Sequence, residues 1–289
     1  MTERFIFNGE EKQVTGIDEN GYGPLIGPLI ITGIRLILPY DSIYSTTRYI
    51  LNFHKSIKDS KKVFKRSRRS YIIGESIALS ILKSAGYNIE SFHSLLFSLS
   101  DAIPLDLTDF KLPTWQDKKH IDDFLLPQHV KVDKIHIEVF QANRFNDFVE
   151  RYNNKSFLDF YGFKLVRDKL NADVYMMGKI GGTNNYQKFF ELTKEHPEVI
   201  LEEKEVSYYK MNDEKMYFLL NGDEMYLPLM LAGIIGKYVR ELYMKAICER
   251  FGLFGDVPFA SGYRHDKNTE ILKRRIEENH MSKYFIRTR

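Results

Sequence analysis

The N-terminal part of the chain contains two apolar stretches separated by a turn rich in glycine and proline. Residues 12–18 place apolar Val14 and Ile17 among polar neighbours, whereas residues 27–38 are apolar almost throughout. β-Branched residues are frequent in both stretches, and such runs are typical of strands. Gly21, Gly23 and Pro24 make up half of residues 19–24, which predicts a turn there. We therefore expect two strands joined as a hairpin.

Helical and strand periodicities alternate along the rest of the chain. Apolar positions at helical spacing predict helices that end at Gly86, cover 157–170, begin near Asn184, and run from Glu224 to Phe251. Alternating patterns predict strands over 132–141, over 171–182 and on both sides of a turn at Asn212–Glu214. Strands followed by interleaved helices and strands indicate an α/β fold, with a mixed central sheet flanked by helices.

We interpret residues 1–289 as a single domain with two distinctive parts. Residues 87–131 contain three prolines, the only tryptophan and no sustained periodicity, so we expect an insertion of uncertain order. Residues 224–289 are expected to form a helical C-terminal part.

Composition limits the classes of protein that fit. The 42 Lys and Arg residues nearly balance the 39 Asp and Glu residues, so only local clusters can argue for nucleic-acid binding. The single cysteine excludes an internal disulfide and suits a reducing compartment. Three prolines and Arg35 interrupt the apolar residues 22–40, which disfavours a membrane span. With no signal-peptide pattern at the N-terminus, we expect a cytoplasmic protein without membrane association.

Asp18 and Glu19 form an acidic pair where the first predicted strand meets its turn. Two close carboxylates repel each other unless a cation lies between them, and Mg²⁺ prefers carboxylate oxygens together with water and phosphate. A metal site is therefore one interpretation of the pair, and a polar turn after a strand is the other. Pro24 and Pro28 argue against a dinucleotide-binding glycine loop, because no helix begins there.

Three further groups have a functional and a purely structural interpretation. Lys61 and Lys62, in Asp-Ser-Lys-Lys and followed by more cations, suit phosphate contacts or an exposed helix face. Asp223 precedes the long helix, where it suits a metal ligand or a helix cap. Tyr263, after Ser-Gly, suits stacking on a sugar or base, or a place in the core.

Taken in order along the chain, these features resemble the ribonuclease HII family, also called type 2 ribonuclease H. The family's opening motif, Asp-Glu-x-Gly-Arg-Gly-Pro-x-x-Gly-Pro, corresponds here to residues 18–28, written DENGYGPLIGP. Asp-Ser-Lys-Lys, an acid before a long helix and Ser-Gly-Tyr then follow. The resemblance runs from about residue 12 to the C-terminus and leaves out 87–131.

The resemblance implies an RNase H-like fold that cleaves RNA–DNA hybrids, or duplexes with an embedded ribonucleotide. Four carboxylates would hold two Mg²⁺ or Mn²⁺ ions, and by position Asp18, Glu19 and Asp223 are three of these catalytic, metal-binding acids. The implied substrate-binding residues surround them. They are the glycine-turn residues Gly21, Tyr22 and Gly23, the phosphate-contacting Lys61 and Lys62, and the sugar-packing Tyr263.

The chain also departs from the family pattern. Met177 is expected in the place of the third acid, Tyr22 replaces the motif's arginine, and Gly233 replaces a serine of the long helix. Met is a poor ligand for a hard cation, so we expect reduced activity. One alternative to the family's two metal ions is that this protein binds a single ion. Glu138 is a conceivable replacement acid, whereas Asp173 lies too far along its strand.

Two hypotheses about function follow. The first is a metal-dependent endoribonuclease of reduced activity, favoured by the three retained acids. The second is a catalytically silent relative that binds nucleic acid, or a protein partner through 87–131, favoured by the three departures.

Overall fold

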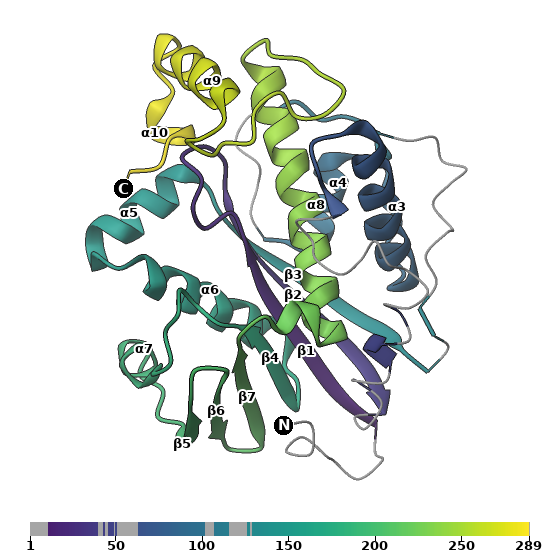
Figure 1. The fold of residues 1–289 in the computed structure, drawn as a ribbon, viewed down its shortest axis with the longest axis vertical. Coiled ribbons are helices and arrows are strands. Elements are labelled where there is room, and N and C mark those ends of the chain that lie inside the picture. Colours follow the sequence, from purple (N-terminus) through teal and green to yellow (C-terminus); the bar gives the residue numbers. More distant parts are fainter. Residues whose placement is uncertain are drawn as a thin grey trace.

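The computed structural model describes residues 11–39, 43, 46–48, 50, 63–101, 107–115, 126–127 and 129–288. Within these ranges seven strands form one sheet in the order β3-β2-β1-β4-β7-β6-β5, with helices packed on both faces (Figure 1). The strands are β1 (Glu11–Asn20), β2 (Leu29–Pro39), β3 (Lys131–Phe140), β4 (Val174–Gly178), β5 (Glu198–Glu202), β6 (Val206–Met211) and β7 (Glu214–Leu219).

The helices account for most of the remaining described chain. They are α3 (Arg68–Ser84), α4 (Phe92–Leu99), α5 (Ala142–Tyr152), α6 (Lys155–Leu170), α7 (Gln187–Leu192), the 3₁₀ turn η5 (Gly222–Glu224), α8 (Leu227–Arg250), α9 (Lys267–Glu278) and α10 (Ser282–Phe285). The pattern of apolar and polar residues in the sequence did not predict α4, α5 or β5. Lys61 and Lys62 lie outside the described residues.

The mixed central sheet predicted from the sequence is confirmed. β1 and β2 form the expected antiparallel hairpin, and β6 and β7 form another around Asn212. β1 pairs in parallel with β4, and β4 in parallel with β7. The C-terminal ends of β1, β4 and β7 therefore lie side by side at one edge of the sheet, the usual place for ligands in sheets of this kind.

The two faces of the sheet belong to different hydrophobic clusters. Val14, Val174 and Met176 face a cluster that contains most of α3, α4 and α8, and Ile17, Tyr175 and Met177 face a second cluster built from α6 and α7. The described part of 87–131 joins the first cluster. Its buried residues there are Phe92, Leu95, Leu96, Leu99, Leu107, Leu112, Trp115 and Val130. Among the described residues, no helix is long and apolar enough to cross a membrane.

One glycine sets how closely α8 approaches the sheet. A Cβ added at Gly16 would lie 2.1 Å from the carbonyl carbon of Pro228, so the first turn of α8 rests on the bare backbone of β1. This contact lies two residues before Asp18, and it fixes the start of α8 relative to the acidic end of β1.

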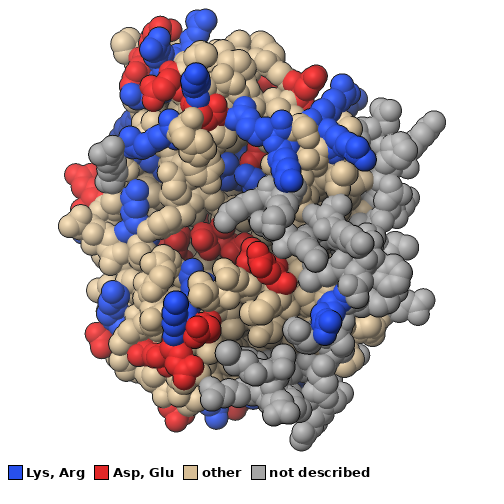
Figure 2. Space-filling model, in the orientation of Figure 1, with Lys and Arg blue, Asp and Glu red and all other residues tan. Residues whose placement is uncertain are grey.

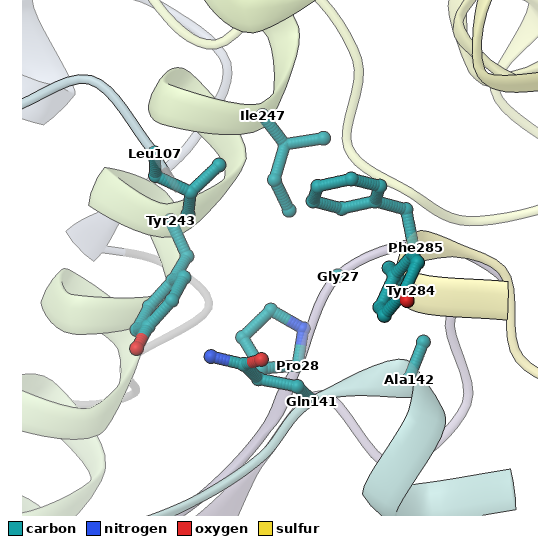
Figure 3. A pocket seen from close by; sticks show the side chains of 9 residues that line it. All are labelled: Gly27, Pro28, Leu107, Gln141, Ala142, Tyr243, Ile247, Tyr284 and Phe285. Atoms are coloured by element: carbon teal, nitrogen blue, oxygen red, sulfur yellow. The ribbon is translucent and has the colours of Figure 1, made fainter. Parts of the chain in front are cut away.

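A small apolar cavity lies beside Gly27 and Pro28, between α5, α8 and α10 (Figure 3). Tyr243, Ile247 and Phe285 contribute to its walls. Its volume of about 20 Å³ holds no more than about one water molecule. We therefore assign it no role in binding substrate.

Candidate active site

The acidic pair lies over the end of β4. Ile17 is in register with Met177, so the next residues, Asp18 and Gly178, are neighbours on the parallel strands. A Cβ added at Gly178 would lie 3.1 Å from Asp18 Oδ1 and 3.5 Å from Glu19 Oε2. Both carboxylates are half-buried and border the space above Gly178.

The prediction that Met177 occupies the third acid's place is wrong by one residue. Side chains alternate along a strand, and Met177 points to the opposite face. It is 2% exposed and packs in the α6 cluster, where it lines a small hollow with Phe160, Phe163 and Phe218. Gly178, without a side chain, is the residue that faces Asp18. The end of β4 thus presents neither an acid nor a thioether to the site, and the oxygens of Asp18 and Glu19 lie close to Gly178.

Asp223 approaches the same end of the sheet from the α8 side. It lies in η5, four residues after Leu219, whose register partner is Gly178. η5 packs against both β4 and α8. The N-cap of α8 is Tyr226, and the amide of Leu227 donates to Thr47 Oγ1 at 2.9 Å. Asp223 is therefore not the N-cap residue of α8.

Acidic side chains gather in a hollow at the centre of one face of the molecule, with Lys and Arg side chains above it (Figure 2). Among the described residues, however, no three His, Cys, Asp or Glu side chains already surround a common point. The convergence of Asp18, Glu19 and Asp223 on shared cations remains a prediction.

The glycine turn after β1 is held by the loop that contains Tyr263. The amides of Leu25 and Ile26 both donate to the carbonyl of Gly262, at 2.8 and 3.1 Å. A Cβ added at Gly23 would lie 3.9 Å from the Tyr263 ring, so the structure brings these two predicted substrate-binding residues together. Tyr263 is half-buried, with the Arg240 guanidinium 5.3 Å from its ring centre.

Two buried arginines lie beneath this turn. Gly21 has φ +92°, and a Cβ there would lie 2.6 Å from Arg240 Nε, so only glycine fits. Arg287, 3% exposed, donates from Nε to the carbonyl of Gly27 at 2.8 Å and from Nη1 to the carbonyl of Gly21 at 2.6 Å. Burial, together with the charge of Arg240, lowers the pKa of Arg287 to about 9. The C-terminal segment thus holds the shape of the turn.

Tyr22, in the place of the motif's arginine, turns toward α6. Its hydroxyl lies 3.5 Å from Ser156 Oγ in the first turn of that helix. Burial raises the pKa of Tyr22, the hydrogen bond with Ser156 opposes this, and the charges of Asp159 and Glu19 add to the increase. A neutral Tyr22 supplies no positive charge for a phosphate, unlike the arginine it replaces.

Sequence patterns did not identify Asp159 as a candidate. It lies on the apolar face of α6, is 1% exposed, and its Oδ1 atom has no hydrogen-bond partner among the described residues. Burial raises its carboxyl pKa well above the usual range; the Arg287 guanidinium lowers this pKa, and the Asp18 carboxylate raises it further. The sequence feature that could have identified Asp159 is its place as an acid inside the otherwise apolar stretch Phe157–Phe163.

The other acids considered as replacements are engaged elsewhere. Glu138 lies on β3, separated from β1 by β2, and it pairs with His136 at 3.2 Å and Arg144 at 3.4 Å. It does not border the site. Asp173 lies before the start of β4, where its Oδ2 accepts a hydrogen bond from the Gln13 amide at 2.9 Å.

The donor set suits a hard divalent cation. Carboxylate oxygens are the ligands that Mg²⁺ and Mn²⁺ prefer. Asp18 and Glu19 offer such oxygens beside Gly178, and a buried, unpartnered carboxylate oxygen of Asp159 is present on the adjoining helix. These observations fit a metal site at the strand ends.

Comparisons with known proteins agree with this architecture. No family model matches the chain. A ribonuclease HII of Methanococcus vannielii is 24% identical over 273 residues, which are 93% of this chain and 79% of that protein. Structural similarity extends to the PCNA:RNase HII complex from Archaeoglobus fulgidus (TM-score 0.54, 17% identity, 96% of this chain and 94% of that one). It also extends to ribonuclease H2 from Pyrococcus horikoshii OT3 (TM-score 0.53, 16% identity, 93% and 89%).

The fold is therefore RNase H-like, with a mixed seven-stranded sheet flanked by helices. The resemblance noted in the sequence is confirmed, since the chain is similar to a ribonuclease HII over 93% of its length at 24% identity. A structural neighbour, Bst-RNase HIII in complex with Mn²⁺ (TM-score 0.54, 13% identity, 95% of this chain and 65% of that one), is a related fold with a bound divalent metal.

Proposed function

We propose that this protein is a metal-dependent endoribonuclease that hydrolyses a phosphodiester at a ribonucleotide, within an RNA–DNA hybrid or a largely DNA duplex. The observation that carries the proposal is the pairing of Asp18 and Glu19 over Gly178, at the edge where β1, β4 and β7 end together. Its relatives are ribonucleases HII, and an Mn²⁺-bound structural neighbour supports a divalent metal.

Each part of the site has a role in this reaction. Asp18, Glu19 and Asp223 would hold Mg²⁺ or Mn²⁺, which when bound activates water and stabilises the leaving oxygen. The backbone at Gly21 and Gly23, shaped by Arg240 and Arg287, would approach the ribose 2′-hydroxyl, the group that distinguishes RNA from DNA. Tyr263, beside Gly23, would pack on the neighbouring sugar. Activity is lower than in a complete site, because Gly178 contributes no carboxylate.

The alternative is a silent relative that binds the same duplexes, or a protein partner through residues 87–131. The absence of an acid at Gly178 favours it. The retention of three of the four expected acids, Asp18, Glu19 and Asp223, favours the enzyme, because a silent protein has no catalytic reason to keep them. We therefore give the enzyme priority.

Single-turnover cleavage of a duplex with one embedded ribonucleotide separates the two functions. We expect the wild-type protein to cleave next to the ribonucleotide in Mn²⁺, and not to cleave an all-DNA duplex of the same sequence. Asp18→Asn should slow cleavage on the order of a thousandfold, because losing a metal ligand removes several kcal/mol of charge stabilisation. Tight binding of this duplex without its cleavage, in Mg²⁺ and in Mn²⁺, would establish the silent relative instead.

Lys61 and Lys62 are expected to contact phosphates, as the sequence resemblance implies. A protein that neutralises a phosphate releases counterions, so the affinity falls with salt by about one unit of log–log slope per contact. The double variant Lys61→Ala, Lys62→Ala should reduce the slope by roughly two units, measured by fluorescence anisotropy of a labelled hybrid. An unchanged slope would assign both lysines to the solvated surface. Lys204→Ala, an exposed cation elsewhere, serves as the control.

A further inference from the structure

Asp159 is a buried acid, and the burial of its carboxylate costs free energy. The side chain is 1% exposed and lies on α6 between Leu158 and Phe160, both of which are buried. A buried carboxylate is strongly disfavoured unless it is paired, hydrogen-bonded or bound to a metal. One of its oxygens, Oδ1, has no hydrogen-bond partner among the described residues. Buried acids left in this way are concentrated at functional sites.

The nearest candidate for a structural partner is Arg287, but no ion pair joins the two. Arg287 directs Nε and Nη1 to the carbonyls of Gly27 and Gly21 instead. The two buried charges influence each other without meeting. Arg287 therefore explains how a charged Asp159 is tolerated, and leaves its oxygen available to another cation.

The contacts of the first turn of α6 indicate that the Asp159 side chain points toward Asp18 and Glu19. Ser156 lies 3.5 Å from the Tyr22 hydroxyl, and a Cβ added at Gly181 would lie 3.6 Å from Ser156 Oγ. The first turn of α6 therefore faces both the turn after β1 and the loop after β4. Asp159 follows Ser156 by three residues, which places it on the same face of the helix.

Asp159 and Asp223 thus approach the strand ends from opposite sides. Asp223 comes from the α8 side, and Asp159 comes from the α6 side. Asp18 and Glu19 lie between them, over Gly178, which carries no acid at the end of β4.

We propose that Asp159 is a further metal-ligating carboxylate of this site, and that it replaces the acid missing at Gly178. The inference rests on the proposed function, since it assigns a ligand to the same metal site. Asp159 supplies its oxygen from a helix rather than from a strand end.

Mn²⁺ binding by isothermal titration calorimetry tests the assignment without relying on catalysis. Asp159→Asn keeps the size of the side chain and removes its charge, so the metal-free variant should unfold at or above the wild-type temperature. We expect it to lose one Mn²⁺ ion, or to bind Mn²⁺ about tenfold or more weakly. The Mn²⁺-induced increase in unfolding temperature should shrink in parallel. Asp168→Asn, an exposed acid on the same helix, should bind as the wild type does.

The outcomes distinguish this inference from the function on which it rests. If Asp18→Asn abolishes binding while Asp159→Asn binds Mn²⁺ as tightly and in the same number as the wild type, Asp159 is no ligand and the metal site stands without it. If the wild-type protein binds no Mn²⁺, both the metal site and the role of Asp159 are overturned. Should Asp159→Asn fold poorly, Asp159→Ala and the double variant Asp159→Asn, Gly178→Asp provide the same comparison. Restored binding in the double variant supports the replacement, and unrestored binding opposes it.

Discussion

Gly178→Asp is expected to increase Mg²⁺-dependent cleavage of a ribonucleotide-containing duplex by on the order of tenfold or more. The new carboxylate would extend toward Asp18 and Glu19, because a Cβ at this position already lies within 3.5 Å of an oxygen of each. A ligand that improves binding of the second cation stabilises the charge of the leaving oxygen, and each 1.4 kcal/mol or so corresponds to tenfold in rate. Without metal, repulsion among three acids should lower stability by about 1 kcal/mol. Single-turnover rates and metal-dependent thermal unfolding measure both effects.

Met177→Asp is the matched comparison, one residue away on the same strand. Its carboxylate would enter the α6 cluster beside Phe160, Phe163 and Phe218, where Arg167 is already paired with Glu195. Burial of a charge in such a place costs several kcal/mol, so we expect a lower unfolding temperature and no gain in cleavage. Faster cleavage with Met177→Asp and no increase with Gly178→Asp would show that Met177, and not Gly178, faces Asp18.

Gly16→Ala is expected to destabilise the protein by about 3 kcal/mol or more and to abolish most cleavage. The added methyl group would overlap the backbone of Pro228 at 2.1 Å, and backbone atoms cannot rotate away as a side chain does. α8 must then move off β1, which also moves Asp223 away from Asp18. Urea unfolding gives the stability loss, and cleavage of the folded fraction gives the loss of function.

A glycine at the other end of α8 provides the control for Gly16→Ala. Gly252 has φ +72°, and nothing lies within 4 Å of an added Cβ. Gly252→Ala should cost only the 1–2 kcal/mol or so of a left-handed backbone and should leave cleavage of the folded protein unchanged. Equal losses in the two variants would show that close packing of α8 on β1 does not position the site.

The sequence predicted the parts of the fold that local periodicity determines. Both hairpins and the helices at 157–170 and 224–251 follow from apolar spacing, and the structure contains them within a few residues. The short α5 and β5 were missed. α5 carries only two fully buried residues, Ala142 and Phe145, and β5 none, so neither leaves a strong pattern.

The site was predictable where a motif carried it and not where tertiary packing did. Gly23 and Tyr263, far apart in sequence, were both assigned to substrate binding by resemblance, and the structure places them together. The exchange of Met177 for Gly178 was an error of register, because a shift by one residue in a strand reverses the face. Asp159 and Arg287 were missed because their burial depends on how α6 and the C-terminal segment pack, which no local pattern records.

A crystal structure of the protein soaked with Mn²⁺, read in anomalous difference maps, tests the central claim most directly. The account predicts at least one Mn²⁺ ion bound jointly by Asp18 and Glu19, at 2.0–2.3 Å or so from their oxygens, with Asp223 contacting the same ion or its bound water. An Asp159 oxygen on the ion, or on a second one, would extend the set. Absence of Mn²⁺ at Asp18 under saturating conditions, or an ion there with Asp223 turned away, would contradict the proposed site.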